Sequence, residues 1–163
     1  MAETSIRVLA KKGDVYDTNG QRPAALRCGT VWEILSKHRR LNMTTREVAD
    51  TLVKLCSAAK FDEATEKLYS PEIVSMEAGA PPGGSRETKG IAAVKAKGEW
   101  WMTNHEVHGC TVEGPLVAGS HFAVTFKLDV TFKPEKRRFT MDEIAVYKVA
   151  DGKIVYEEFF YSM

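Results

Sequence analysis

Three polar side chains near the end of the chain are of the types that proton transfer requires. Asp142, Glu157 and Tyr161 alternate with apolar residues in two β-like stretches. A carboxylate in an apolar pocket has its pKa raised toward neutrality, which suits a general base beside a carbonyl group. Tyr161 can donate a hydrogen bond to a developing enolate oxygen. The pattern predicts metal-free acid/base chemistry on a hydrophobic carbonyl-containing or cyclic molecule.

Two further positions are candidates for the same chemistry. Glu77 lies at the mouth of an early predicted strand, beside a loop, and is a second candidate base. His105 opens a later strand with Glu106 and His108, where His105 and a carboxylate can form an acid/base pair. Alternate positions on one strand supply too few ligands for a metal without a third group, so we expect neither metal nor cofactor.

Each candidate also has a structural explanation. Asp142 can lie at a strand end in water, Glu157 can pair with a basic residue, and Tyr161 can simply pack. Trp100 and Trp101 can cover the open end of a pocket and stack on a planar ligand, or they can belong to the core.

The orientation of these side chains depends on a predicted hairpin. Asp151-Gly152 stands between two β-like runs and is a strong signal for a two-residue turn, because Gly and Asp tolerate positive φ. This turn pairs Ile144 with Phe159 and Asp142 with Tyr161. In the last strand, odd-numbered residues then point inward.

The preceding run, residues 121–132, alternates between apolar and polar side chains. If residues 133–137 contain a three-residue loop, Phe126 lies opposite Ile144 and Leu128 opposite Asp142. The predicted inner face then carries Val124, Phe126, Leu128, Val130, Ile144, Val146 and Phe159. With Trp100 and Trp101, its members Phe126, Leu128, Ile144 and Phe159 are the residues expected to line a substrate pocket.

The predicted outer face mixes charged and aromatic side chains. Lys127 and Glu143 are placed on it as a cross-strand ion pair. Tyr147, Tyr156 and Phe160 share this surface, so we predict a homodimer that forms through it. The other predicted outer residues are Thr125, Asp129 and Glu158.

Three helices are expected to support the sheet. Residues 44–47 have the capping-box pattern, and the helix that follows has a buried stripe that includes Cys56, which we interpret as core and not as a nucleophile. The remaining elements are expected in this order: a helix over 62–69, a strand over 72–77, a loop over 78–88, a helix over 91–103 and then strands only.

The totals are those of one domain of 163 residues, 44% of them apolar. Residues 1–43 show no sustained period and carry eight basic and four acidic side chains, so we expect a poorly ordered N-terminal extension before a working domain over 44–163. With 23 Lys and Arg against 22 Asp and Glu, the charge gives no reason to expect nucleic acid or an anionic membrane as partner.

The compartment is suggested by the three cysteines, which are odd in number and widely spaced. No apolar run approaches the roughly 18 to 20 residues that span a bilayer. We therefore expect a cytoplasmic protein. The apolar lining predicted for the pocket indicates a small hydrophobic molecule as its partner.

Several stretches carry a family resemblance: LYSPEIVSME, KGIAAV and DGKIVYEEFFY, together with the capped helix. In these, residues 44–163 resemble the nuclear transport factor 2-like superfamily, in particular its SnoaL-like branch of polyketide cyclase and ketosteroid isomerase relatives. The resemblance implies an α+β fold in which a curved antiparallel sheet wraps around three helices and encloses a small-molecule pocket.

The resemblance does not transfer the steroid isomerase mechanism. The tyrosine and two aspartates that act in ketosteroid isomerases fall at Leu52, at Met76 or its neighbour Glu77, and at Ile144, and two of these three positions are apolar. Two functions therefore stay open: a lyase or isomerase, and a non-catalytic ligand-binding or dimeric interaction module.

Overall fold

The computed structural model describes residues 42–80 and 83–162. The expected N-terminal extension lies outside this part of the chain, except for Asn42 and Met43. These two residues belong to the compact unit that begins at Asn42.

Helix α2, Thr45–Ser57, starts at the predicted capping box. The Thr44 side chain accepts from the backbone N–H of Glu47 at 3.2 Å, and the Thr44 N–H donates to Glu47 Oε2 at 2.7 Å. Two N–H groups of the first turn are thereby satisfied. The buried stripe is also confirmed, and Cys56 belongs to it at 4% exposure.

The next elements differ slightly from their predicted limits. They are α3 (Phe61–Leu68), β1 (Tyr69–Met76), β2 (Glu87–Lys89) and α4 (Ile91–Asn104). The expected loop over 78–88 is wrong at its end, because Glu87–Lys89 pairs with Val74–Met76 as an antiparallel strand. That pairing gives the end of β1 a neighbour on each side.

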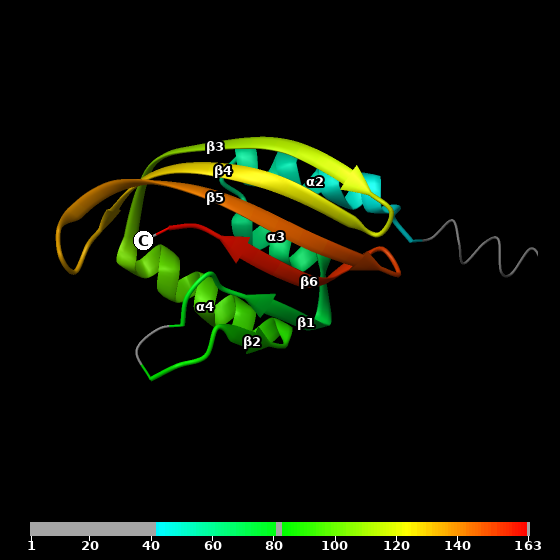
Figure 1. The fold of residues 1–163 in the computed structure, drawn as a ribbon, viewed down its shortest axis with the longest axis horizontal. Coiled ribbons are helices and arrows are strands. Elements are labelled where there is room, and N and C mark those ends of the chain that lie inside the picture. Colours follow the sequence, from blue (N-terminus) through cyan, green and yellow to red (C-terminus); the bar gives the residue numbers. More distant parts are fainter. Residues whose placement is uncertain (1–41, 81–82, 163) are drawn as a thin grey trace, which may run out of the picture. The chain divides into compact units, whose positions relative to one another are not determined.

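Four long strands complete the sheet: β3 (His105–Ala118), β4 (His121–Phe132), β5 (Arg137–Ala150) and β6 (Lys153–Phe160). Within the described residues, six strands form one curved sheet in the order β2-β1-β6-β5-β4-β3 (Figure 1). Neighbours are antiparallel except for β1 and β6, which run parallel. The α+β class and the curved sheet are confirmed.

The core lies between this sheet and the helices. Helix α2 packs against β3, β4 and β5, while α4 packs against β1 (Figure 1). Strand β4 faces the core as its alternation predicts, since its inward residues are all at most 8% exposed: Phe122, Val124, Phe126, Leu128 and Val130. Cys56 from α2 and Ile154 from β6 are buried in the same core.

The predicted register between β4 and β5 is wrong by one residue. Phe132 pairs with Arg137, so the connection is a four-residue turn and not a three-residue loop. Lys136 occupies the left-handed region at φ 53° in this turn, where glycine is the residue usually expected. Phe126 consequently pairs with Glu143 and Leu128 with Met141.

The predicted register between β5 and β6 is wrong for a second reason. The Asp151-Gly152 turn forms as expected and pairs Ala150 with Lys153. Val149 then pairs with Ile154 but Lys148 with Tyr156, which leaves Val155 as an extra residue in a β-bulge. Ile154 and Glu157, three residues apart, therefore both face the core.

Both corrections reverse the two faces of β5, because a slip of one residue turns every side chain over. Ala145, Tyr147 and Val149 are buried, whereas Ile144 is 49% exposed. Asp142 is exposed as well. Asp142, Ile144 and Val146 therefore do not belong to the inner face.

The ion pair predicted between Lys127 and Glu143 is wrong for the same reason. Lys127 lies opposite Asp142 on the outer face, and its Nζ is 3.9 Å from Glu113 Oε1. Glu143 faces the helices instead.

Candidate functional site

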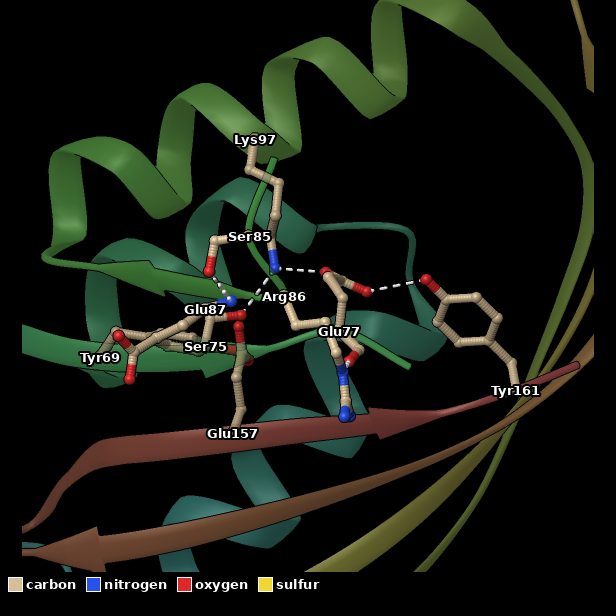
Figure 2. Close-up of polar contacts among 9 residues, drawn as sticks. All are labelled: Tyr69, Ser75, Glu77, Ser85, Arg86, Glu87, Lys97, Glu157 and Tyr161. Atoms are coloured by element: carbon tan, nitrogen blue, oxygen red, sulfur yellow. Dashed lines mark hydrogen bonds and ion pairs between the residues drawn. The ribbon is translucent and has the colours of Figure 1, made fainter. Parts of the chain in front are cut away.

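A polar cluster on the inner side of the sheet is centred on Lys97 of α4. Its ammonium donates to Ser75 Oγ at 2.6 Å and to Glu77 Oε1 at 2.5 Å. The Tyr161 hydroxyl donates to the other oxygen of Glu77, Oε2, at 3.0 Å. Figure 2 shows these groups converging from α4, the end of β1 and the residue after β6.

Local structure explains why these three segments meet. Ser75 lies within β1, and Glu77, two residues after Ser75, directly follows the end of the strand, so the alternation of an extended chain puts both on one face. The Gly90 N–H donates to Ile73 O at 2.8 Å, which ties the start of α4 to β1. Gly90 has φ 82°, a conformation that glycine adopts without strain. Lys97 then projects from α4 across the end of β1.

Glu157 forms the deep end of the cluster. Its side chain is 2% exposed, and its Oε2 accepts a hydrogen bond of 2.5 Å from the Tyr69 hydroxyl. Burial raises the pKa of Glu157, and hydrogen bonds from Tyr69 and Ser75 together with the Lys97 charge oppose that rise. Ser75 and Glu157 lie opposite each other in the parallel pairing of β1 and β6.

Glu143 joins the cluster from β5. Withdrawal from water raises the pKa of its carboxyl to about 7, and the negative charges of Glu77 and Glu157 add to the rise. The Lys97 ammonium acts in the opposite direction. No side chain of residues 42–80 and 83–162 forms a hydrogen bond or ion pair with Glu143, so its carboxyl has no fixed protein partner there.

The arrangement places three carboxyl groups, among the side chains described, around one ammonium group. Glu143 and Glu157 are coupled, because the negative charge of one makes ionisation of the other harder. With its pKa raised to about 7, Glu143 keeps a proton near neutral pH more readily than an isolated glutamate does. The cluster is therefore able to donate and accept a proton in that range.

The sequence prediction brought some of these residues to the right place. Glu77, Glu157 and Tyr161 all lie in the cluster. Asp142 does not, because it faces outward. Their catalytic roles stay predictions.

His105 lies in an aromatic environment. Its Nδ1 is 2.9 Å from Trp101 O, and since a carbonyl only accepts, Nδ1 carries the proton. Its ring stacks on that of Trp101 with centroids 4.6 Å apart, and the Phe132 ring centroid is 5.1 Å away. The contacts of His105 within the described chain include no carboxylate, so the proposed His–carboxylate pair is not formed there.

The residues expected to line a pocket are divided between several environments. Phe126 and Leu128 are buried, and Phe159 lies with its ring centroid 5.1 Å from Lys97 Nζ. Trp101 is partly buried, Trp100 is 57% exposed, and Ile144 faces outward. Phe159 thus contacts the polar cluster, and Phe126 lies opposite Glu143 in the pairing of β4 and β5.

Sequence reasoning missed Glu143 and Lys97. Glu143 was assigned to the outer face through the register error, although its neighbour Ile144 was the position matched to a catalytic aspartate of ketosteroid isomerases. Lys97 carried no signal, because a lysine in a helix is usually solvated. Its helix begins within the KGIAAV motif, which was recognised as the entry to the third helix, and that helix packs on β1.

No group of three or more His, Cys, Asp or Glu side chains in residues 42–80 and 83–162 is arranged to hold a metal ion. No helix in the same ranges is long and apolar enough to cross a membrane.

A curved sheet that carries polar side chains on its helix-covered face defines an α+β protein of the nuclear transport factor 2-like class. Its fold is shared with a solved structure from Xanthomonas campestris described as cystatin-like, at 15% identity and a TM-score of 0.61. That alignment covers 74% of this chain and 92% of the other.

The particular family is the SnoaL-like domain family, to which this chain belongs, since the family model matches residues 43–161. A crystal structure from Mesorhizobium loti, provisionally named a SnoaL-like polyketide cyclase, is 43% identical and has a TM-score of 0.70. The alignment covers 73% of this chain and all 100% of that one.

A more distant likeness shows the fold alone. A protein from Bacillus subtilis, provisionally named an isomerase, is 20% identical with a TM-score of 0.59, over 74% of this chain and 90% of the other. No protein of curated function matches the chain.

Proposed function

We propose that this domain binds a small hydrophobic molecule with a carbonyl group and moves a proton within it, as a lyase or isomerase. Glu143 is the acid/base group of the proposal. The observation that carries it is the position of Glu143 on the inner face of the sheet, opposite Phe126, where withdrawal from water and the charges of Glu77 and Glu157 raise the pKa of its carboxyl to about 7. General acid/base catalysis is most efficient when the pKa of the catalytic group lies near the working pH.

The chemical step is a proton abstraction beside the carbonyl. Glu143, as carboxylate, takes a proton from the adjacent carbon, and the electron pair of that C–H bond moves through the carbonyl to its oxygen. The resulting enolate oxygen accepts a hydrogen bond from the Tyr161 hydroxyl, which Glu77 holds in the absence of substrate. In a substrate with a double bond next to that carbon, the enolate is a dienolate. Glu143 then returns the proton to the far carbon of the double bond, which shifts the double bond into conjugation with the carbonyl and completes an isomerisation.

The names given to similar proteins agree with this direction. The relative from Mesorhizobium loti is provisionally named a polyketide cyclase and the one from Bacillus subtilis an isomerase. Proton transfer is a usual step both in cyclisation and in isomerisation.

The test is solvent deuterium exchange, which requires no knowledge of the natural product. In deuterium oxide, the wild-type protein is expected to accelerate exchange at the carbons beside the carbonyl of 2-tetralone, a cyclic ketone probe, followed by proton NMR. Glu143→Gln should lower the rate by a factor on the order of 10²–10⁴, the usual contribution of a general base. Asp142→Asn, the adjacent residue on the outer face, is the matched control and should keep the wild-type rate.

A non-catalytic ligand-binding module is the alternative, and one observation favours it. The donors of Lys97 and Tyr161 are already committed to Ser75 and Glu77 within the cluster. If 2-tetralone shifts the NMR signals of the protein but exchanges no faster than in buffer, the alternative holds. Equal exchange rates for wild type and Glu143→Gln would remove Glu143 from the reaction.

The outer face of the sheet is where we place a homodimer contact. Ile144 is 49% exposed and Phe160 is 47% exposed, and the two pair across β5 and β6. Paired apolar side chains on a strand surface are more informative than single ones. For the compartment we retain the cytoplasm, which the number and spacing of the cysteines favour.

A further inference from the structure

Glu157 is not used by the step proposed for Glu143, although it is the most buried acid of the cluster. Its side chain is 2% exposed. Its carboxyl already receives hydrogen bonds from Tyr69 and Ser75. A group so enclosed cannot reach a ligand without a rearrangement of the core, so its function must be exerted through its neighbours.

The hydrogen bonds around Ser75 have fixed directions. An ammonium group has donors only, so Lys97 Nζ donates to Ser75 Oγ at 2.6 Å. The Ser75 hydroxyl proton is therefore free to point elsewhere, and the acceptor beside it is the carboxyl of Glu157, which lies opposite Ser75 in the pairing of β1 and β6 and whose pKa Ser75 lowers. Ser75 is 0% exposed, so water does not compete for either bond.

The order of bonds runs from the core to the site. Tyr69 donates to Glu157 at 2.5 Å, Ser75 donates to the same carboxyl, and Lys97 donates to Ser75 and, at 2.5 Å, to Glu77. Only the Ser75 hydroxyl has a choice of direction, and turning its proton toward Lys97 would leave two donors facing each other.

We propose that Glu157 is a positioning residue, which with Tyr69 orients the Ser75 hydroxyl so that Lys97 is held against Glu77 and does not pair with Glu143. The inference rests on the proposed function, because it explains why the carboxyl of Glu143 stays unpaired. Glu157 touches no substrate in this arrangement. It acts through Ser75 on the ammonium of Lys97.

The experiment follows the Lys97 ammonium directly. In the full-length protein labelled with ¹⁵N, a hydrogen-bonded, enclosed ammonium gives a proton–nitrogen correlation, and its hydrogen exchange rate can be measured. Ser75→Ala and Glu157→Gln should each raise the exchange rate of Lys97 Hζ by about tenfold or more, as expected for loss of a hydrogen bond from a charged donor. Glu158→Gln, the next residue of β6, is the control and should leave the rate unchanged, because Glu158 contacts Tyr156 and Arg86 instead.

A double variant tests the direction of the bonds. In Glu157→Gln, the amide oxygen accepts from Tyr69, so the amide N–H₂ points at Ser75 and opposes its hydroxyl proton. In Tyr69→Phe with Glu157→Gln, the amide is free to turn its oxygen toward Ser75, and the slow exchange of Lys97 should return. A side chain that merely fills space would not give this rescue.

Two results would overturn the proposal. Slow Lys97 exchange in both Ser75→Ala and Glu157→Gln would mean that Glu77 alone holds the ammonium. Fast exchange that the double variant fails to reverse would mean a general loosening of the core. If Glu157→Gln does not fold, Ser75→Ala decides, since it removes one hydroxyl only. None of these measurements needs a substrate, so their failure is distinct from a failure of Glu143→Gln in the exchange assay.

Discussion

Glu143 and Asp142 show how far one position along a strand changes the chemistry of a carboxyl group. The two residues are adjacent in β5, yet Asp142 lies in water while Glu143 faces the helices. Only the inward group loses its hydration and meets the charges of Glu77 and Glu157, which is why its pKa reaches about 7. The acid/base candidate is thus defined by orientation and not by residue type.

Glu143 should make the stability of the domain depend on pH. Its pKa is raised from 4.5 in the unfolded chain to about 7 in the folded one, so the folded state binds the proton more tightly. The stabilisation is therefore fully present below pH 4.5 and is lost as the pH rises through 7. The loss should amount to about 3 kcal/mol between these limits, since one pKa unit corresponds to about 1.4 kcal/mol.

Urea unfolding of wild type and Glu143→Gln at a series of pH values measures this contribution as the difference between the two curves. Glu47→Gln is a control of opposite sign, because hydrogen bonds from Thr44 lower the pKa of Glu47. The contribution of Glu47 is present at neutral pH and disappears in acid. A wild-type minus Glu143→Gln difference that stays constant from pH 4 to 8 would show that Glu143 is not in a desolvated site.

At this scale the sequence predicts the site unevenly. Glu157 and Tyr161 were placed on the inner face by the alternation of the last strand, and Glu77 was named for its position at the end of an early strand. Lys97 could not be found, since its ammonium becomes a partner of Ser75 and Glu77 only when α4 lies on β1. That contact is tertiary, and no local pattern encodes it.

Turns and bulges decide the register at the scale of the elements. Strand β5 was turned over by two single-residue errors, the length of the turn after Phe132 and the bulge at Val155. The two errors agreed with each other, because each shifts β5 by one residue relative to a neighbour. A coherent register on both sides of a strand is therefore weaker evidence than it looks.

The hairpin at Asp151-Gly152 gives a sharp test at this scale. Gly152 has φ +75°, and a Cβ there would lie 2.8 Å from the backbone N of Met43. Gly152→Ala should therefore destabilise the domain twice, by about 1–2 kcal/mol for the left-handed backbone and by about 1–3 kcal/mol for the overlap with Met43. Thermal and urea unfolding measure the sum.

Gly119→Ala is the matched control for this change. Gly119 also has a positive φ, +57°, but a Cβ there meets nothing within 4 Å. It should show only the backbone cost, so the difference between the two variants isolates the packing of Asn42 and Met43 against the turn. Equal losses of stability for both variants would show that the chain before α2 does not contact Gly152 in solution.

The fold of the domain was more predictable than its site. A capped amphipathic helix, a strictly alternating strand β4 and a glycine hairpin each need only local sequence, and together they leave an antiparallel sheet over helices as the arrangement that buries every apolar face. The parallel pairing of β1 with β6 was not predictable in the same way. It joins residues more than eighty positions apart, such as Ser75 and Glu157, and it creates the deep end of the polar cluster.

The reversed face of β5 makes the proposed homodimer testable. Ile144 now stands with Phe160 on the outer face, where each is close to half exposed. A stable dimer buries roughly 1,200–2,000 Å² in total, so these two residues can form only the centre of the contact, surrounded by neighbouring residues of the same face.

Light scattering coupled to size exclusion should give a mass close to two chains of 18.2 kDa for the wild type. Ile144→Lys with Phe160→Lys should shift it to one chain, because two ammonium groups per copy would be brought together in a dry interface. Met102→Lys is the control: Met102 is 43% exposed in helix α4, which does not belong to the outer face of the sheet, and its substitution should leave the dimer intact. A monomeric wild type would contradict the dimer, and the exposed pair would then be a feature of the isolated domain. A double variant that still dimerises would show that the contact lies elsewhere.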